Sequence, residues 1–126
     1  MKITFIIGLP GSGKTHFAAT LDNEDTVIFD DFSADDIPYL PKEHIKNLII
    51  IDPNLCNPDV LTRAVSFFST RYPSADIKYI YFENAPAKAL QNIQIRGDNR
   101  SVANFIKLNT KIYNPPIDAL SIWQPE

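Results

Sequence analysis

Eight consecutive residues near the N-terminus have the types and spacing of a loop that binds nucleoside triphosphates. The stretch Gly8-Leu9-Pro10-Gly11-Ser12-Gly13-Lys14-Thr15 fits the pattern G-x-x-x-x-G-K-[ST]. Glycines are needed because the backbone must curl until successive N–H groups point at phosphate oxygens, which side chains would obstruct. Lys14 then supplies charge to the β- and γ-phosphates, and the Thr15 hydroxyl is placed to bind Mg²⁺. Instead of a glycine-rich structural turn, we predict a nucleotide site comprising Gly8, Pro10, Gly11, Ser12, Gly13, Lys14 and Thr15.

Acidic residues follow two of the apolar runs that predict strands. Asp30 and Asp31 come after Thr26 to Phe29, and Asp52 comes after Leu48 to Ile51. Phosphoryl transfer to a hydroxyl needs an anionic base, and one carboxylate of the Asp30-Asp31 pair is suitably placed for that role. Asp52 has the position of an acid that supports the metal from behind its direct ligands. The alternatives are a turn or cap at Asp30-Asp31 and a plain turn residue at Asp52.

Two arginines flank a short polar segment between two predicted helices. Arg96 and Arg100 lie on either side of Gly97-Asp98-Asn99. An arginine on a mobile segment can close over a triphosphate and neutralise the charge that develops on the transferred phosphoryl group. We predict a lid at about residues 96–101, with both arginines binding nucleotide and with Arg96 also catalytic, like Lys14. The alternative is a pair of helix-terminal arginines on a solvated surface.

Short apolar runs of strand type alternate with segments of helical period, which is the pattern of βαβ units and a parallel sheet. The predicted strands are residues 2–7, 26–29, 48–51 and 77–82, with an ambiguous fifth near 120–123. The predicted helices are residues 14–21, 58–72 behind an Asn57 cap, 86–96, and 102–113 behind a Ser101 cap. Prolines at 38 and 41 leave room for at most one short helix between 33 and 46.

These elements predict an α/β fold, specifically a single-domain P-loop NTPase. We expect a three-layer α/β/α sandwich with a mainly parallel sheet of four or five strands. Ligands of such sheets bind at the carboxyl ends of the strands. The loop at 8–15, the Asp30-Asp31 pair and residues 52–54 each follow a strand directly, so we expect them to converge on one edge.

The length and composition fit one ordinary globular domain, residues 1–126. Apolar residues make up 44% and charged residues 21% of the chain, which excludes collagen, a coiled coil and extensive disorder. The single cysteine, Cys56, excludes an intramolecular disulfide and fits a reducing compartment. No apolar run approaches the length that spans a bilayer. We therefore expect a soluble cytoplasmic protein without a membrane partner.

The distribution of charge is more informative than its total of −3. The negative total removes the simplest argument for a nucleic-acid binder, which is a strongly basic chain. Residues 22–36 contain seven acids and no Lys or Arg, whereas residues 88–111 contain five bases and one acid. Two solvated faces of opposite charge would explain this pattern, and so would a charge separation that serves function; the sequence favours neither explanation.

Several of these motifs, taken in order, resemble the 5′-kinase domain of phage polynucleotide kinase. The likeness depends on the loop at 8–15, on Asp30-Asp31-Phe32, on the segment Asp52-Pro53-Asn54-Leu55-Cys56-Asn57-Pro58, and on Arg96-Gly97. It covers roughly residues 1–113. The resemblance implies a kinase that uses ATP and Mg²⁺, with Asp30 as general base, Asp52 as an acid supporting the metal and Arg96 as the lid arginine.

The chain departs from that family in two places that concern the acceptor. Ser33 stands where the family carries an arginine, and only 20 residues separate Asp31 from Asp52, where the family has a longer insert. We therefore expect donor chemistry to be kept and acceptor recognition to be reduced or rebuilt. The expected acceptor is a 5′-hydroxyl of DNA, RNA or a nucleoside. The alternatives are a small-molecule or nucleoside monophosphate kinase, and a regulatory module that binds nucleotide without phosphotransfer. ATP is favoured because the guanine-binding segment N-K-x-D is absent.

Overall fold

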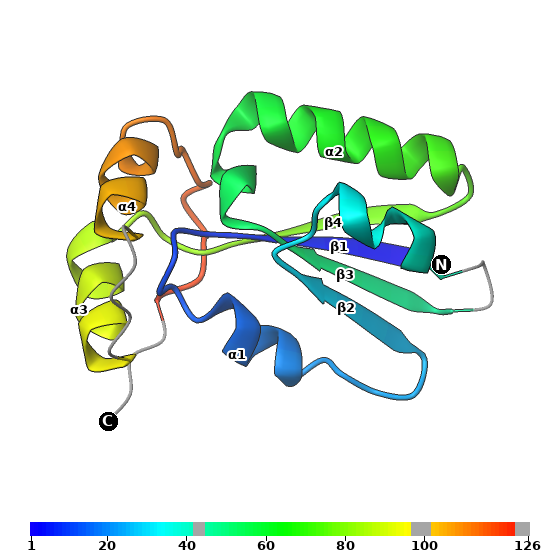
Figure 1. The fold of residues 1–126 in the computed structure, drawn as a ribbon, viewed down its shortest axis with the longest axis horizontal. Coiled ribbons are helices and arrows are strands. Elements are labelled where there is room, and N and C mark those ends of the chain that lie inside the picture. The colour runs from blue at the N-terminus through cyan, green and yellow to red at the C-terminus, as the bar shows by residue number, and fades with distance from the viewer. Residues whose placement is uncertain (42–44, 97–101, 123–126) are drawn as a thin grey trace.

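The computed structural model describes residues 1–41, 45–96 and 102–122. Its sheet consists of β1 (Lys2–Ile7), β2 (Thr26–Asp30), β3 (Asn47–Ile51) and β4 (Asp76–Tyr81). All pairings are parallel, and the four strands lie in the order β2-β3-β1-β4 (Figure 1). The α-helices are α1 (Lys14–Ala19), α2 (Pro58–Arg71), α3 (Pro86–Arg96) and α4 (Val102–Thr110). Two 3₁₀ helices, η1 (Ala34–Tyr39) and η2 (Pro53–Cys56), follow β2 and β3. The predicted α/β class and parallel sheet are confirmed.

The two central strands, β1 and β3, pair in register from Lys2 with Asn47 to Ile6 with Ile51. Every residue after the first is buried in both strands. Long uninterrupted apolar runs are typical of parallel strands that are covered on both faces. The edge strands β2 and β4 are only partly buried.

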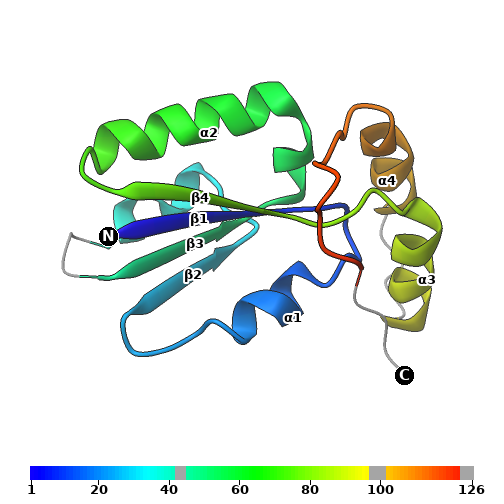
Figure 2. The ribbon, with the colours of Figure 1, turned by 180° about the vertical axis from the view of Figure 1, so that it is seen from behind.

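Helices cover the two faces of the sheet, as the alternation of side chains along a strand requires. The larger core cluster includes Phe5 of β1 and Phe68 of α2, and the smaller one includes Ile6, Ile51 and Ala18 of α1. Figures 1 and 2 show α2 on one face of the sheet and α1 on the other. The expected layers are therefore present for these two helices.

The helices α3 and α4 pack against each other beyond the carboxyl ends of the strands, not on a face of the sheet (Figures 1 and 2). A side chain just after β4 fixes this pair there. The Asn84 amide donates hydrogen bonds to the carbonyls of Thr110 and Tyr113, at 3.0 Å each. As a result α3 lies beside the loop that follows β1.

The C-terminal segment differs from its prediction. A fifth strand near 120–123 is not formed; Leu120 instead makes a single parallel bridge to Phe82, and residue 123 lies outside the described residues. Leu120 bonds to the Tyr81 carbonyl and the Glu83 N–H, but the Ile122 N–H donates to the Glu83 side chain instead of continuing the backbone pairing. Ser101, the predicted cap of α4, also lies outside the described residues. Within residues 1–41, 45–96 and 102–122, the helices lack the length and apolar character needed to cross a bilayer.

Candidate functional site

The loop between β1 and α1 depends on two glycines with left-handed backbone conformations. Gly11 has φ 83° and Gly13 has φ 92°, a region that side chains strongly disfavour. A Cβ atom on Gly11 would also lie 2.4 Å from the carbonyl oxygen of Ala89 in α3. Glycine at position 11 is therefore required both by the turn and by the close approach of α3.

The ammonium group of Lys14 is folded back onto this loop. Its Nζ donates to the carbonyl oxygens of Gly8 and Leu9, at 2.8 Å each, and the residue is only 7% exposed. The Ser12 hydroxyl donates to the Leu9 carbonyl at 2.6 Å, and Ser12 is completely buried. Lysine is almost never buried unless its charge is paired or hydrogen-bonded. The loop thus holds a positive charge at the end of β1.

Thr15, the predicted metal ligand, contacts Asp30, the predicted base. The Thr15 Oγ1 donates to Asp30 Oδ2 at 2.6 Å, across an exposed junction between α1 and the end of β2. A hydroxyl has one proton and two lone pairs, so this bond leaves its oxygen able to accept a metal ion. The contact gives Asp30 an orienting role toward Thr15, which the sequence does not predict.

Asp52 lies at the end of β3, where it caps η2. One of its oxygens accepts hydrogen bonds from the Asn54 backbone N–H at 2.9 Å and from the Asn54 amide at 3.1 Å. Burial raises the pKa of Asp52 above its ordinary value of 3.8, and the charge of Asp31 adds to this rise. The Asn54 hydrogen bonds and the charge of Lys14 act in the opposite direction. The carboxyl ends of β1, β2 and β3 therefore bring Lys14, Asp31 and Asp52 into one electrostatic neighbourhood.

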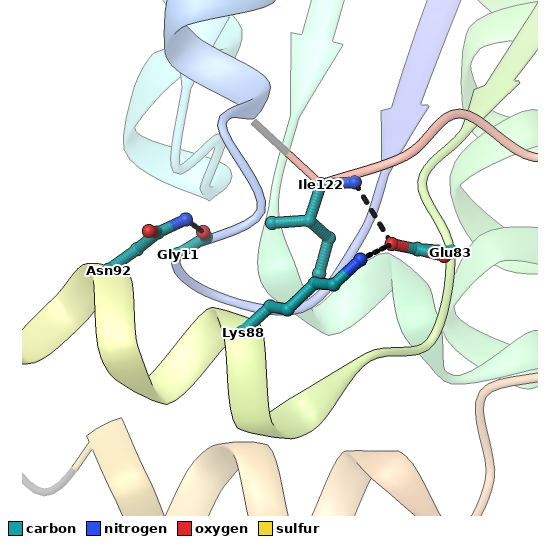
Figure 3. Close-up of polar contacts among 5 residues, drawn as sticks. All are labelled: Gly11, Glu83, Lys88, Asn92 and Ile122. Carbon is teal, nitrogen blue, oxygen red and sulfur yellow. Dashed lines mark hydrogen bonds and ion pairs between the residues drawn. The ribbon is translucent and has the colours of Figure 1, made fainter. Parts of the chain in front are cut away.

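The helix α3 is attached to the glycine-rich loop by Asn92. Its amide donates to the Gly11 carbonyl at 2.8 Å (Figure 3). Sequence motifs do not predict this residue, although a polar side chain beside Ala89 and Ile93 on one buried helix face is a detectable signal. Arg96 is the last residue of α3, and its side chain is not among those described. Arg100 and most of the predicted lid lie outside the described residues.

Contacts from the C-terminal part of the chain support the same edge of the sheet. Glu83 forms an ion pair with Lys88 of α3 at 3.2 Å and accepts a hydrogen bond from the Ile122 N–H at 3.3 Å (Figure 3). The buried Tyr113 hydroxyl contacts the carbonyl oxygens of Ile7 and Phe82, at the ends of β1 and β4. These contacts brace the start of α3 and the end of β1, from which the loop begins.

Cys56, the last residue of η2, lies beside Gly8 at the start of the loop. Burial raises the pKa of its thiol to about 12, although the charge of Lys14 and a hydrogen bond from the Gly8 backbone oppose the rise. The thiol is therefore neutral at physiological pH and behaves as a small packing group.

A cavity of about 630 Å³ opens between η1, the end of β3 and α2. Its walls are mainly apolar, and its polar side chains are Ser33, Asp52 and Arg63. The principal apolar residues are Phe32, Ile37, Leu55, Val60, Phe67 and Phe68. Asp52 thus connects the cavity with the neighbourhood of Lys14. The sequence does not predict this cavity, although Arg63 interrupts an apolar stripe of α2 at helical spacing.

Comparison with known proteins shows a viral relative. No protein-family model matches the chain. The chain is 35% identical over 108 residues to an uncharacterized protein of Acanthamoeba polyphaga mimivirus, an alignment that covers 79% of this chain and 75% of the viral protein. The chain therefore belongs to the same family as that mimivirus protein. The relative is described as uncharacterized, so family membership by itself assigns no activity.

Proposed function

We propose that this protein is a P-loop kinase that transfers the γ-phosphate of ATP·Mg²⁺ to a hydroxyl acceptor. The observation that supports this most strongly is the loop at residues 8–13, with two left-handed glycines and the buried ammonium of Lys14 hydrogen-bonded to its carbonyls. The loop follows a central strand of a parallel sheet, at the edge where such sheets bind ligands.

A purely structural turn is a weaker explanation of the same loop. Desolvating an ammonium group is costly, and a glycine-rich turn does not require a lysine whose ammonium is buried against it. A lysine held against a loop of curled backbone is instead suited to phosphate oxygens, whose negative charge compensates the desolvated ammonium.

The residues around the loop fit Mg²⁺ and a base. Thr15 would hold the metal through its free lone pairs, with Asp52 behind it, and bound Mg²⁺ would neutralise charge on the phosphates. Asp30 would accept the proton of the acceptor hydroxyl as its oxygen attacks the γ-phosphorus. The bond from that phosphorus to the β,γ-bridging oxygen then breaks, and ADP leaves. Arg96, and Arg100 further along, would add positive charge from the lid.

A 5′-hydroxyl of a nucleic acid or nucleoside is the first acceptor class to test, because of the resemblance to polynucleotide kinase. The cavity beside Asp52 gives specific support to a second candidate, a kinase for a small molecule such as a nucleotide. Binding of ATP without transfer to any acceptor would instead favour a regulatory module.

The test is a screen for transfer of ³²P from γ-labelled ATP to nucleosides, nucleotides and 5′-hydroxyl oligonucleotides. We expect transfer by the wild type, none by Lys14→Ala, and transfer close to wild type by Lys107→Ala, which removes an exposed lysine of α4. Asp30→Asn should reduce transfer about 100-fold or more, as loss of a general base does. Unchanged transfer by Asp30→Asn would reject its role as base, and unchanged transfer by Lys14→Ala would reject the proposal.

A further inference from the structure

We infer that the cavity between η1 and α2 is the acceptor site, and that it takes a small ligand with one planar ring, an acceptor hydroxyl and a single anionic group, such as a nucleoside 3′-monophosphate. The inference rests on the proposed kinase function and defines its acceptor. By this inference the site recognises a single nucleotide unit, and further nucleotides of a polynucleotide add nothing to binding.

The cavity has the size and position of an acceptor site. Its volume of about 630 Å³ is typical of pockets that enclose one small ligand. Asp52 forms part of its wall, and the charge of Lys14 acts on the same carboxylate. The lining includes neither Asp30 nor the loop at 8–15, so the hydroxyl of a ligand in the cavity would extend past Asp52 to reach the γ-phosphate and the proposed base.

The walls suit the faces of a planar ring. Phe32, Phe67 and Phe68 line the cavity, and the rings of Phe32 and Phe68 pack at 5.2 Å between centroids. Ile37 of η1 also lines it. Aromatic and aliphatic walls of this kind bind heteroaromatic rings through apolar burial and offset stacking.

Arg63 supplies the only positive charge among the cavity's described lining residues. Its side chain is exposed, and its Nε donates a long hydrogen bond, 3.4 Å, to the Asp59 carbonyl of its own helix. In the described part of the chain no carboxylate forms an ion pair with it. A guanidinium presents several N–H donors in a fixed plane, which matches a phosphate or carboxylate on the ligand.

The charge around the cavity disfavours a long polyanion. Proteins that bind single strands provide a positive groove that follows several phosphates, with aromatic platforms along it. Here η1, which forms one rim, contains Asp35 and Asp36, and Asp52 forms part of the wall. One anionic group can pair with Arg63, whereas further phosphates would meet repulsion.

The experiment compares acceptors of increasing length in the ³²P assay, using a nucleoside, its 3′-monophosphate, and 5′-hydroxyl oligonucleotides of two to twenty residues. The wild type should show its highest kcat/KM with the 3′-monophosphate and no gain with length. Arg63→Ala should lower kcat/KM for the 3′-monophosphate roughly 10- to 100-fold, the cost of a charge-assisted hydrogen bond. It should change the value for the neutral nucleoside less than about twofold. Arg71→Ala, at the end of the same helix, is the matched control and should leave both values unchanged.

A second variant and a second readout separate this inference from the proposed function. Ala64→Leu narrows the cavity and should lower kcat/KM for the acceptor while ATP·Mg²⁺ binding, measured by calorimetry, stays at the wild-type level. Rising kcat/KM with oligonucleotide length, or an Arg63→Ala effect equal for charged and neutral acceptors, would overturn the inference and leave the kinase proposal standing. Absence of any transfer or of Lys14-dependent ATP binding would instead reject the kinase proposal itself.

Discussion

Lys14 is the one charged side chain that is buried in the described part of the chain, and its surroundings connect the loop with the end of β3 and with η2. Its charge acts on Asp52 and on the Cys56 thiol, while its Nζ bonds to Gly8 and Leu9. At this scale the site is a positive centre with carboxylates around it. Such an arrangement is suited to phosphates, which would pair with the ammonium, and to a metal ion, which would pair with the carboxylates.

At position 11, replacing glycine by alanine should destabilise the protein by about 2–5 kcal/mol. The left-handed backbone costs about 1–2 kcal/mol for a residue with a Cβ, and overpacking against the Ala89 carbonyl adds about 1–3 kcal/mol. Urea unfolding measures the change in the free energy of unfolding. The exposed substitution Ser69→Ala is the control, expected to stay within about 0.5 kcal/mol. A Gly11→Ala protein as stable as the wild type would show that the loop conformation is wrong.

Asp52→Asn should stabilise the free protein at neutral pH. Burial raises the pKa of Asp52 in the folded state, so its protonated form favours folding. That contribution is fully present below the unfolded value near 3.8 and is lost as pH rises through the folded pKa. At pH 7 the wild type therefore carries a penalty that asparagine lacks, and asparagine still accepts the Asn54 hydrogen bonds.

Urea midpoints at pH 7 and pH 3.5 measure this effect. The advantage of Asp52→Asn should be present at pH 7 and should shrink at pH 3.5. Asp76→Asn removes an exposed acid and controls for the change in net charge. A less stable Asp52→Asn protein at pH 7 would contradict the assignment of burial as the main influence on this carboxyl group.

At the scale of elements, α3 contacts the loop through a hydrogen bond and through close packing at Gly11. Asn92 donates to the Gly11 carbonyl, and Ala89 leaves no space for a side chain at Gly11. A movement of α3, which ends at Arg96, would therefore displace the loop that we propose to bind phosphate.

Asn92→Ala should weaken ATP·Mg²⁺ binding roughly fivefold, because it removes a hydrogen bond of about 1 kcal/mol that fixes the loop. Asn109→Ala is the matched control. Asn109 is also a buried asparagine, but its amide bonds to the Phe105 carbonyl within α4 and not to the loop. Calorimetric titration should show weaker binding for Asn92→Ala and wild-type binding for Asn109→Ala. Equal losses in both variants would indicate general destabilisation instead of a specific connection.

The elements were largely predictable because their patterns are local. Leu48 to Ile51 form a continuous apolar run, and Asn57 with Pro58 marks the start of α2, where the Asn57 side chain accepts from the Asp59 N–H. The position of α3 was not predictable, because the Asn84 hydrogen bonds that fix it join residues far apart in the chain. The predicted fifth strand was wrong because only Leu120 finds a partner on Phe82.

The proposed donor side of the site was more predictable from the sequence than the proposed acceptor side. The loop and Asp52 follow from sequence because a strand end and a short motif determine where they lie. Three features of the site depend on how helices pack: the contact of Thr15 with Asp30, the contact of Asn92 with the loop, and the cavity lined by Arg63. Side-chain packing between distant segments has no short sequence pattern. This difference explains why the donor side could be proposed from the sequence while the acceptor side required the structure.

In the whole molecule, a parallel sheet carries the glycine-rich loop at its carboxyl edge, and a small cavity opens at the end of β3. Of the acidic segment 22–36, Asp30, Asp31 and η1 lie at or follow the carboxyl end of β2, whereas Asp22 to Asp25 precede β2 at the opposite edge of the sheet. The more basic segment 88–111 includes α4 and most of α3, the helices nearest the proposed lid. The chain belongs to a family that includes a mimivirus protein. The loop and the cavity are the features to compare among members of that family.

The central claim is that residues 8–15 bind a nucleoside triphosphate, and calorimetric titration of the free protein with ATP in the presence of Mg²⁺ tests it most directly. We predict saturable binding with one ATP per chain, weakened at least about 100-fold by Lys14→Ala, because two charge-assisted contacts to phosphate are lost. Lys107→Ala should bind like the wild type. No binding by the folded wild-type protein, or equal binding by the wild type and Lys14→Ala, would contradict the account.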